Sequence, residues 1–66
     1  MNKLFNEIKR ERNFKTDTEL AEFFLMSKAQ ISKLRAGGKL SAYTLMRLHD
    51  KTGRSVEEIR RYARMN

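Results

Sequence analysis

Three helix-start signals constrain the fold of this 66-residue chain more than any other feature. Each is a hydroxyl residue followed three positions later by Glu or Gln, and they begin at Thr16, Ser27 and Ser55. In such a capping box the hydroxyl accepts a hydrogen bond from the third helical amide, and the side chain there reaches back. Apolar residues spaced by three and four follow each box, and strand-like alternation over five or more residues is absent. We therefore expect an all-α fold.

Stop signals divide the chain into five helices without a linker. Asn13, Gly37-Gly38 and Gly53 stand where left-handed or flexible residues commonly end helices. The helices are predicted at residues 2–12, 17–24, about 28–36, 42 to about 51, and from 56 onward. The apolar side chains that would face one core are Leu4, Phe5, Ile8, Leu20, Ala21, Phe24, Ile31, Leu34, Leu45, Leu48, Val56, Ile59 and Tyr62. Residues 1–66 are predicted to form one domain.

Composition narrows the class of function. Fifteen Lys and Arg against eight Asp and Glu give a net charge of +7, which favours polyanionic partners. The chain has no cysteine and one histidine, so a metal site is not expected. Because no nucleophile–base pair, paired carboxylates or phosphate-cradling loop stands out, we expect neither an enzyme nor a cofactor or small-molecule ligand. No apolar run approaches the roughly 20 residues of a membrane span, and no secretory signal opens the chain, so a cytoplasmic location is expected.

The segment between Thr16 and Gly37 carries the functional signal. Only Leu25 and Met26 join the second and third predicted helices, which forces a steep crossing angle. No acidic residue occurs between positions 25 and 48, so the third helix can enter a major groove without phosphate repulsion. The candidate base-contacting residues on its outward side and flank are Lys28, Ala29, Gln30, Ser32 and Lys33. There, Lys can donate to guanine and Gln can pair with adenine.

Residues around this segment are candidates for holding phosphates, which would fix register without reading sequence. The amides at the start of the second helix, and those of the connection after the third, suit an anion. The candidate phosphate-contacting residues are Thr16, Asp17, Thr18, Ser27, Arg35, Lys39, Ser41 and Tyr43. For Tyr43 the alternative, which we favour, is a role in shielding the core.

These residues resemble a known family. Thr16, Leu20-Ala21, Ser27, the run from Ile31 to Leu34, Gly37 and the Ser55-Val56-x2-Ile59 segment are similar to the lambda-type phage repressor and Cro family of helix-turn-helix proteins. The resemblance implies a homodimer on a palindromic DNA operator, in a bacterial or phage-infected cell. It also implies base contacts from the outward face of the third helix. For the dimer interface the candidates are Val56, Tyr62 and Met65, and they are the least supported of the site residues.

Two departures from the family pattern stand out. The family usually has glycine in the turn where this chain has Leu25. Either Leu25 is left-handed, at a cost of about 1 kcal/mol or more, or the turn is built differently. The family also often pairs a basic residue on the first helix with an acid at the end of the third. Here Arg10 would face Arg35, so Arg35 is either free for a phosphate or turned to Glu7 or Glu11.

The sequence thus favours a Cro-like transcriptional repressor. The alternative is an antitoxin-type or other protein-interaction module that also binds DNA. Membrane-surface binding is disfavoured because no predicted helix exposes a broad apolar face. The C-terminal cluster is either a solvated face or a non-specific electrostatic contribution to DNA binding; its members are Arg54, Arg60, Arg61 and Arg64.

Overall fold

Five α-helices and no strand occur in the computed structural model, which describes residues 1–65 and leaves Asn66 outside the described part. They are α1 (Asn2–Arg12), α2 (Asp17–Phe24), α3 (Lys28–Arg35), α4 (Ala42–Thr52) and α5 (Val56–Met65). The all-helical prediction is confirmed, and the predicted helix ends agree with these bounds to within one residue.

The helix starts follow from the predicted caps. Ser27 forms the complete box, because its hydroxyl accepts from the Gln30 amide while the Gln30 side chain accepts from the Ser27 amide. The Thr16 hydroxyl accepts from the Glu19 amide, but the Glu19 carboxylate takes the amide of Lys15, one residue earlier than expected. Ser55 and Ser41 cap α5 and α4 in the same way through their hydroxyls.

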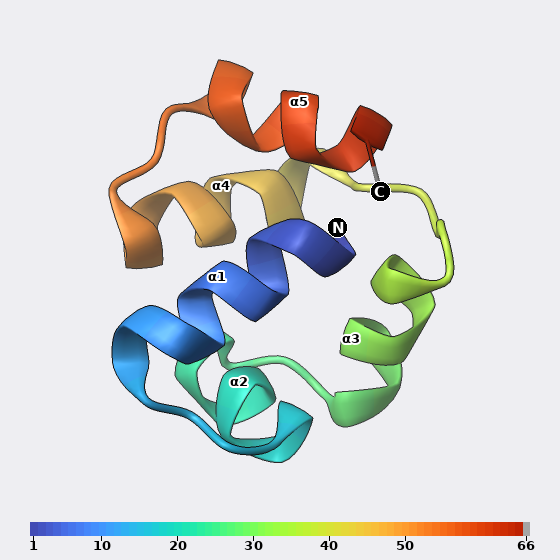
Figure 1. Cartoon of the computed structure of the whole chain (residues 1–66). Coiled ribbons are helices and arrows are strands. Elements are labelled where there is room, and N and C mark those ends of the chain that lie inside the picture. The colour runs from blue at the N-terminus through green and yellow to red at the C-terminus, as the bar shows by residue number, and fades with distance from the viewer. Residues whose placement is uncertain (66) are drawn as a thin grey trace.

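The core lies where the inner stripes of all five helices meet. Figure 1 shows α1 across the middle, with α4 and α5 above it, α2 below it and α3 to one side. Most of the predicted core is buried, but Val56 and Tyr62 are only partly so, and Met1 joins the core. The buried residues among those described are Met1, Leu4, Phe5, Ile8, Leu20, Ala21, Phe24, Ile31, Leu34, Leu45, Leu48 and Ile59. Among residues 1–65, no helix is both long enough and apolar enough to cross a membrane.

The turn between α2 and α3 is built on a left-handed leucine. Leu25 has φ of 56° and ψ of 43°, which settles the conformation that the sequence left open. Its amide donates to the Glu22 carbonyl, and the Met26 amide donates to the Ala21 carbonyl at 2.9 Å. Arg47 of α4 donates to the Leu25 carbonyl at 2.7 Å. These hydrogen bonds hold a conformation that glycine would adopt without strain.

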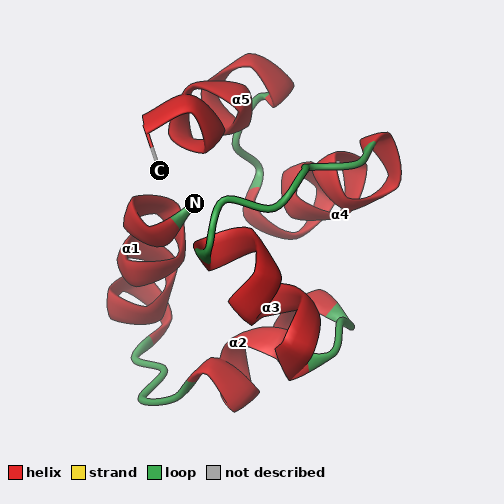
Figure 2. Cartoon of the chain, turned by 90° about the vertical axis from the view of Figure 1, so that its right-hand side faces the viewer, coloured by secondary structure: helices red, strands yellow, loops and turns green. Residues whose placement is uncertain are grey.

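The start of α1 and the end of α5 lie side by side. Both Figure 1 and Figure 2 show the start of α1 close to the end of α5. The contact is made by side chains as well, because the Tyr62 hydroxyl donates to the Glu7 carboxylate. This hydrogen bond raises the pKa of Tyr62, with burial a smaller cause. The first and last helices therefore close the fold together.

Candidate nucleic-acid interface

The outward side of α3 is open to solvent. Ile31 and Leu34 fix the helix to the core, with exposed fractions of 0% and 5%, and Figure 2 shows α3 at the centre of the face turned to the viewer. The five candidate base-contacting residues are all exposed, namely Lys28, Ala29, Gln30, Ser32 and Lys33. Two lysines and three small or uncharged side chains thus make up one unobstructed face.

Gln30 is more restricted than the sequence suggested. Its side-chain oxygen accepts from the Ser27 amide at 2.8 Å and completes the capping box. A bidentate contact to adenine uses both the oxygen and the nitrogen of the amide group. With the box formed, Gln30 keeps its NH2 group free to donate, but its oxygen must be shared between the Ser27 amide and adenine in the predicted pairing.

The end of α3 and the connection after it bring several candidates together. Lys33, Gln30, Lys39 and Ser41 line one shallow hollow of about 230 Å³. Met26 and Leu34 add apolar side chains to the lining. Candidates for base contact and for phosphate contact therefore line one hollow.

Gly38 makes this arrangement sterically feasible. Its amide donates to the Lys33 carbonyl at 2.8 Å and closes the last turn of α3. A Cβ at position 38 would lie 2.7 Å from that carbonyl oxygen, which is closer than real Cβ contacts come. The backbone of the connection passes this close to α3 because position 38 carries no side chain.

An ion-pair network, which the sequence analysis missed, ties α3 to α1 and α2. The Arg35 guanidinium donates to both carboxylate oxygens of Asp17, at 2.9 and 3.0 Å, and Lys9 lies 3.2 Å from the same carboxylate. Arg35 also donates to the Asn2 side chain, whose amide group donates back to the Arg35 carbonyl. The hydrogen bond from Arg35 is the main cause that lowers the pKa of Asp17, and burial opposes it.

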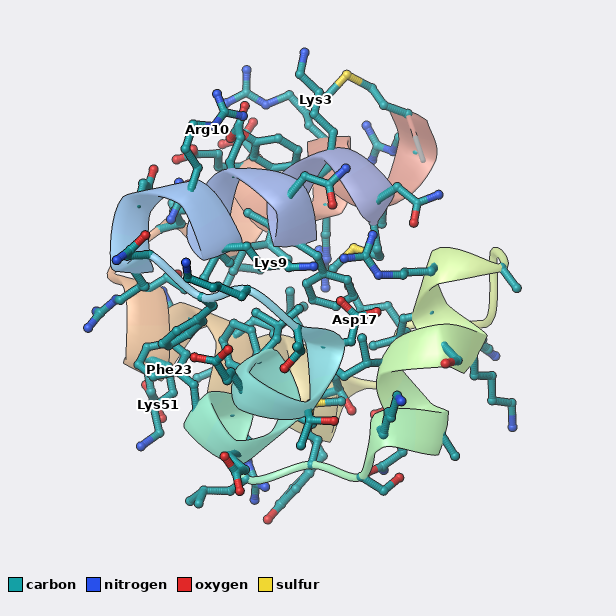
Figure 3. The ribbon with its side chains drawn as sticks, turned by 60° about the horizontal axis from the view of Figure 1, so that its bottom comes forward. Lys3, Lys9, Arg10, Asp17, Phe23 and Lys51 are labelled. Carbon is teal, nitrogen blue, oxygen red and sulfur yellow. The ribbon has the colours of Figure 1, made fainter. Side chains whose placement is uncertain are left out.

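This network corrects three expectations about charged residues. Arg35 does not turn to Glu7 or Glu11, because Asp17 is its partner. Nor is Arg35 a free cation for a phosphate, since its side chain is only 20% exposed and is bonded on both sides. Lys9, not Arg10, supplies the contact from α1, and Figure 3 shows Lys9 and Asp17 turned toward each other.

At the start of α2, the backbone remains the donor for an anion. The carboxylate of Asp17 is held by the network, and the Thr16 hydroxyl is held by the Glu19 amide. A phosphate at this helix end would therefore be held by the amides of Asp17 and Thr18 rather than by the predicted side chains. Thr16 and Thr18 are both exposed, so these amides are accessible from solvent.

Tyr43 does not shield the core. Its side chain is 71% exposed, so the core role we favoured for it is wrong. The Arg47 guanidinium lies 4.7 Å from the ring centre and donates to the Tyr43 hydroxyl. Arg47 thus joins Tyr43 to the exposed Leu25, whose carbonyl it also binds. Nothing in the local sequence around Arg47 indicates a contact with a carbonyl 22 residues away.

The three residues predicted for a dimer interface lie in different environments. Met65 is 57% exposed. Val56 packs partly against the core, and Tyr62 is engaged with Glu7 of α1. The exposed large apolar residues nearest the α2–α3 turn are instead Leu25 and Tyr43.

Comparisons with known proteins do not assign the chain to a family. No protein-family model, curated protein or solved structure matches the chain. Within residues 1–65, no group of three or more His, Cys, Asp or Glu is placed to hold a metal ion.

Proposed function

We propose that the chain is a sequence-specific DNA-binding regulator in which α2 and α3 form a helix-turn-helix and α3 enters the major groove. The observation that carries the proposal is the outward face of α3. It offers Lys28 and Lys33 with short neighbours, and no acidic residue occurs between positions 25 and 48. A groove lined by phosphates accepts such a helix, and the lysines can donate to guanine edges.

The charges around α3 support the same function. Arg35, at its end, is neutralised by Asp17, so the free cations of the surface are lysines that point to solvent. Lys39 and the start of α2 flank α3 and can hold the phosphate backbone. A homodimer on a palindromic site and repression by blocking a promoter are part of the proposal, as the resemblance to repressors and Cro proteins implies.

Selection of binding sites from a random duplex pool tests this function, at near-physiological salt so that non-specific binding is suppressed. The expected result is a short palindrome, whose half-site spacing reports the distance between two recognition helices. The variant K28Q/K33Q should lose the enrichment, whereas K15Q/K51Q, with the same loss of charge away from α3, should keep it. Retention of the pool at low salt without enrichment of any sequence would contradict the proposal.

One observation favours a second candidate, a protein-interaction module. Leu25 and Tyr43 are 67% and 71% exposed around Arg47, and Met46 on α4 is 49% exposed. Exposed apolar side chains of this size suit a protein partner. Co-purification of a defined second protein that is lost in Y43S/M46S, together with failure of the duplex selection, would favour this function over the first.

A further inference from the structure

The arginines of the protein fall into two groups. Four of them have partners within the fold: Arg12 lies over the Phe23 ring, and Arg35, Arg47 and Arg54 bind carboxylates, a hydroxyl or a carbonyl. The others are exposed and have no hydrogen bond, ion pair or ring contact within residues 1–65. Three of these exposed arginines lie on α5, and we call them the arginine face: Arg60, Arg61 and Arg64.

Helical geometry gathers the arginine face on one side of α5. Ile59, at 0% exposure, fixes which side of the helix faces the core. Arg60 and Arg61 are adjacent, and Arg64 follows them by four and three positions, so the three arginines share the side turned away from Ile59. Residues three and four positions apart are neighbours on a helix, and like charges there repel one another. Glu57, in the first turn, is the acidic residue that lies with them along one shallow depression. One carboxylate is set against three arginines there, so the depression keeps a net positive charge.

The hollow between α1 and α5 marks one limit of the arginine face. Lys3 and Arg61 line it together with Glu7 and Glu58, so the charges in it balance. Glu7 accepts from Tyr62, and Glu58 lies 3.7 Å from Arg54. The unbalanced positive charge therefore lies along the depression that the three arginines line.

This surface is separate from the one on α3. Figures 1 and 2 both show α5 along the upper edge of the molecule and α3 at another side. The chemistry differs too, because the exposed cations on and after α3 are lysines, whereas those on α5 are arginines. Guanidinium groups bind phosphate through two parallel hydrogen bonds, which suits recognition of a phosphate backbone without reading bases.

We propose that the arginine face is a second DNA-binding surface, which holds the phosphodiester backbone of a further duplex while α3 engages the first. The partner is a nucleic acid rather than a membrane because the apolar side of α5 is turned into the core. An interfacial helix must instead bury that side in lipid. Held this way, one molecule bridges two DNA segments.

A two-duplex capture assay tests the proposal. The protein is loaded to equal levels on an immobilised duplex, and a fluorescent duplex of unrelated sequence is then added. The wild-type protein should capture the second duplex. The variant R60Q/R61Q/R64Q should capture at least about tenfold less of it. Three phosphate contacts predict that capture falls with salt with a log–log slope of about −3. Gln is nearly as good a helix former as Arg, so α5 should remain folded, as circular dichroism checks.

A charge-matched variant separates the effect of the arginine face from the effect of net charge. R10Q/K15Q/K51Q removes the same charge elsewhere on the surface and should capture the second duplex like wild type. Equal capture by the arginine-face variant and wild type would overturn the proposal, as would equal loss in both variants. Binding of phosphatidylserine vesicles without second-duplex capture would also overturn it. The proposed function can fail independently, since a chain that enriches no sequence in the duplex selection can still bridge two duplexes.

Discussion

Leu25 adopts a backbone conformation that only glycine adopts without cost, and its side chain gains little in return. It is 67% exposed, with φ of 56°. A left-handed residue with a Cβ is strained by about 1–2 kcal/mol, and glycine loses part of that advantage through its more flexible unfolded chain. The residue is held there by the hydrogen bonds of the turn and by Arg47.

Leu25→Gly should therefore raise the free energy of unfolding by about 0.5–1 kcal/mol. Urea denaturation at equilibrium measures the change. Leu25→Ala is the control, because it removes the side chain but keeps the Cβ that causes the strain. If alanine stabilises the protein as much as glycine, the exposed side chain and not the backbone is the source of the cost.

Lys33 is the residue at which base reading can be separated from phosphate binding. Lys33→Ala should weaken binding to the selected site by about 1–3 kcal/mol and relax preference at one base pair if Lys33 contacts a base. If it contacts phosphate alone, all sequences should weaken alike and the salt slope should fall by about one unit. Titrations of duplexes at several salt concentrations measure both quantities, and unchanged affinity would remove Lys33 from the interface.

Among the elements, α3 depends on a carboxylate from another helix. Asp17 binds Arg35 of α3 and Lys9 of α1, and all three side chains are 20–24% exposed. The folded state lowers the pKa of Asp17 below its ordinary value of 3.8. The stabilisation is therefore complete above that value and is lost as pH falls through the lower, folded-state pKa.

Asp17→Asn should lower the free energy of unfolding by about 1–2 kcal/mol near neutral pH. The difference from wild type should shrink as both are acidified below about pH 4, because the wild-type carboxylate then becomes neutral. Urea midpoints of the two proteins across this range provide the measurement. A difference that stays constant down to about pH 2 would mean that the charge of Asp17 is not what stabilises the network.

The sequence predicted helices well because their ends are decided locally. The caps at Thr16, Ser27 and Ser55 depend on residues three positions away, and so do the apolar stripes that define the core. Exposure of the α3 face followed from the same periodicity. The α3 candidates could thus be named in advance, apart from the restriction on Gln30 that its own capping box imposes.

Interactions between helices were not predictable in this way. The partner of Arg35 is 18 residues away and that of Arg47 is 22 away, and both depend on how the helices cross. A long flexible cation can reach several carboxylates, so composition does not select among Glu7, Glu11 and Asp17. The left-handed Leu25 is a similar case, because the cost at one residue is outweighed by the packing of α2 against α3.

For the molecule as a whole, Arg54 closes the contact between distant parts of the chain. It lies just before α5, is 15% exposed, and is 2.7 Å from Glu11, 3.9 Å from Glu7 and 3.7 Å from Glu58. The hydrogen bond to Glu11 is the largest cause that raises the pKa of Arg54. One guanidinium therefore offsets the mutual repulsion of three carboxylates.

Arg54→Ala should destabilise the protein by about 1–3 kcal/mol at neutral pH, since the carboxylates are then left unopposed. Urea unfolding at neutral pH measures this loss. Arg60→Ala, which removes an exposed arginine from the same region, should change stability by no more than about 0.5 kcal/mol. A similar effect of both substitutions would rule out the specific role of Arg54.

The pairing of α1 with α5 also sets the order in which the chain can fold during its synthesis. Ile59 belongs to the core, and Glu7 reaches its partner 55 residues later. At about 5–20 residues per second, α1 leaves the ribosome roughly 3–11 s before α5 does. During that interval Glu7 lacks its hydroxyl partner, and α1 lacks the helix that packs against it. For those seconds α1 exposes more of its surface to other chains than it does in the finished fold.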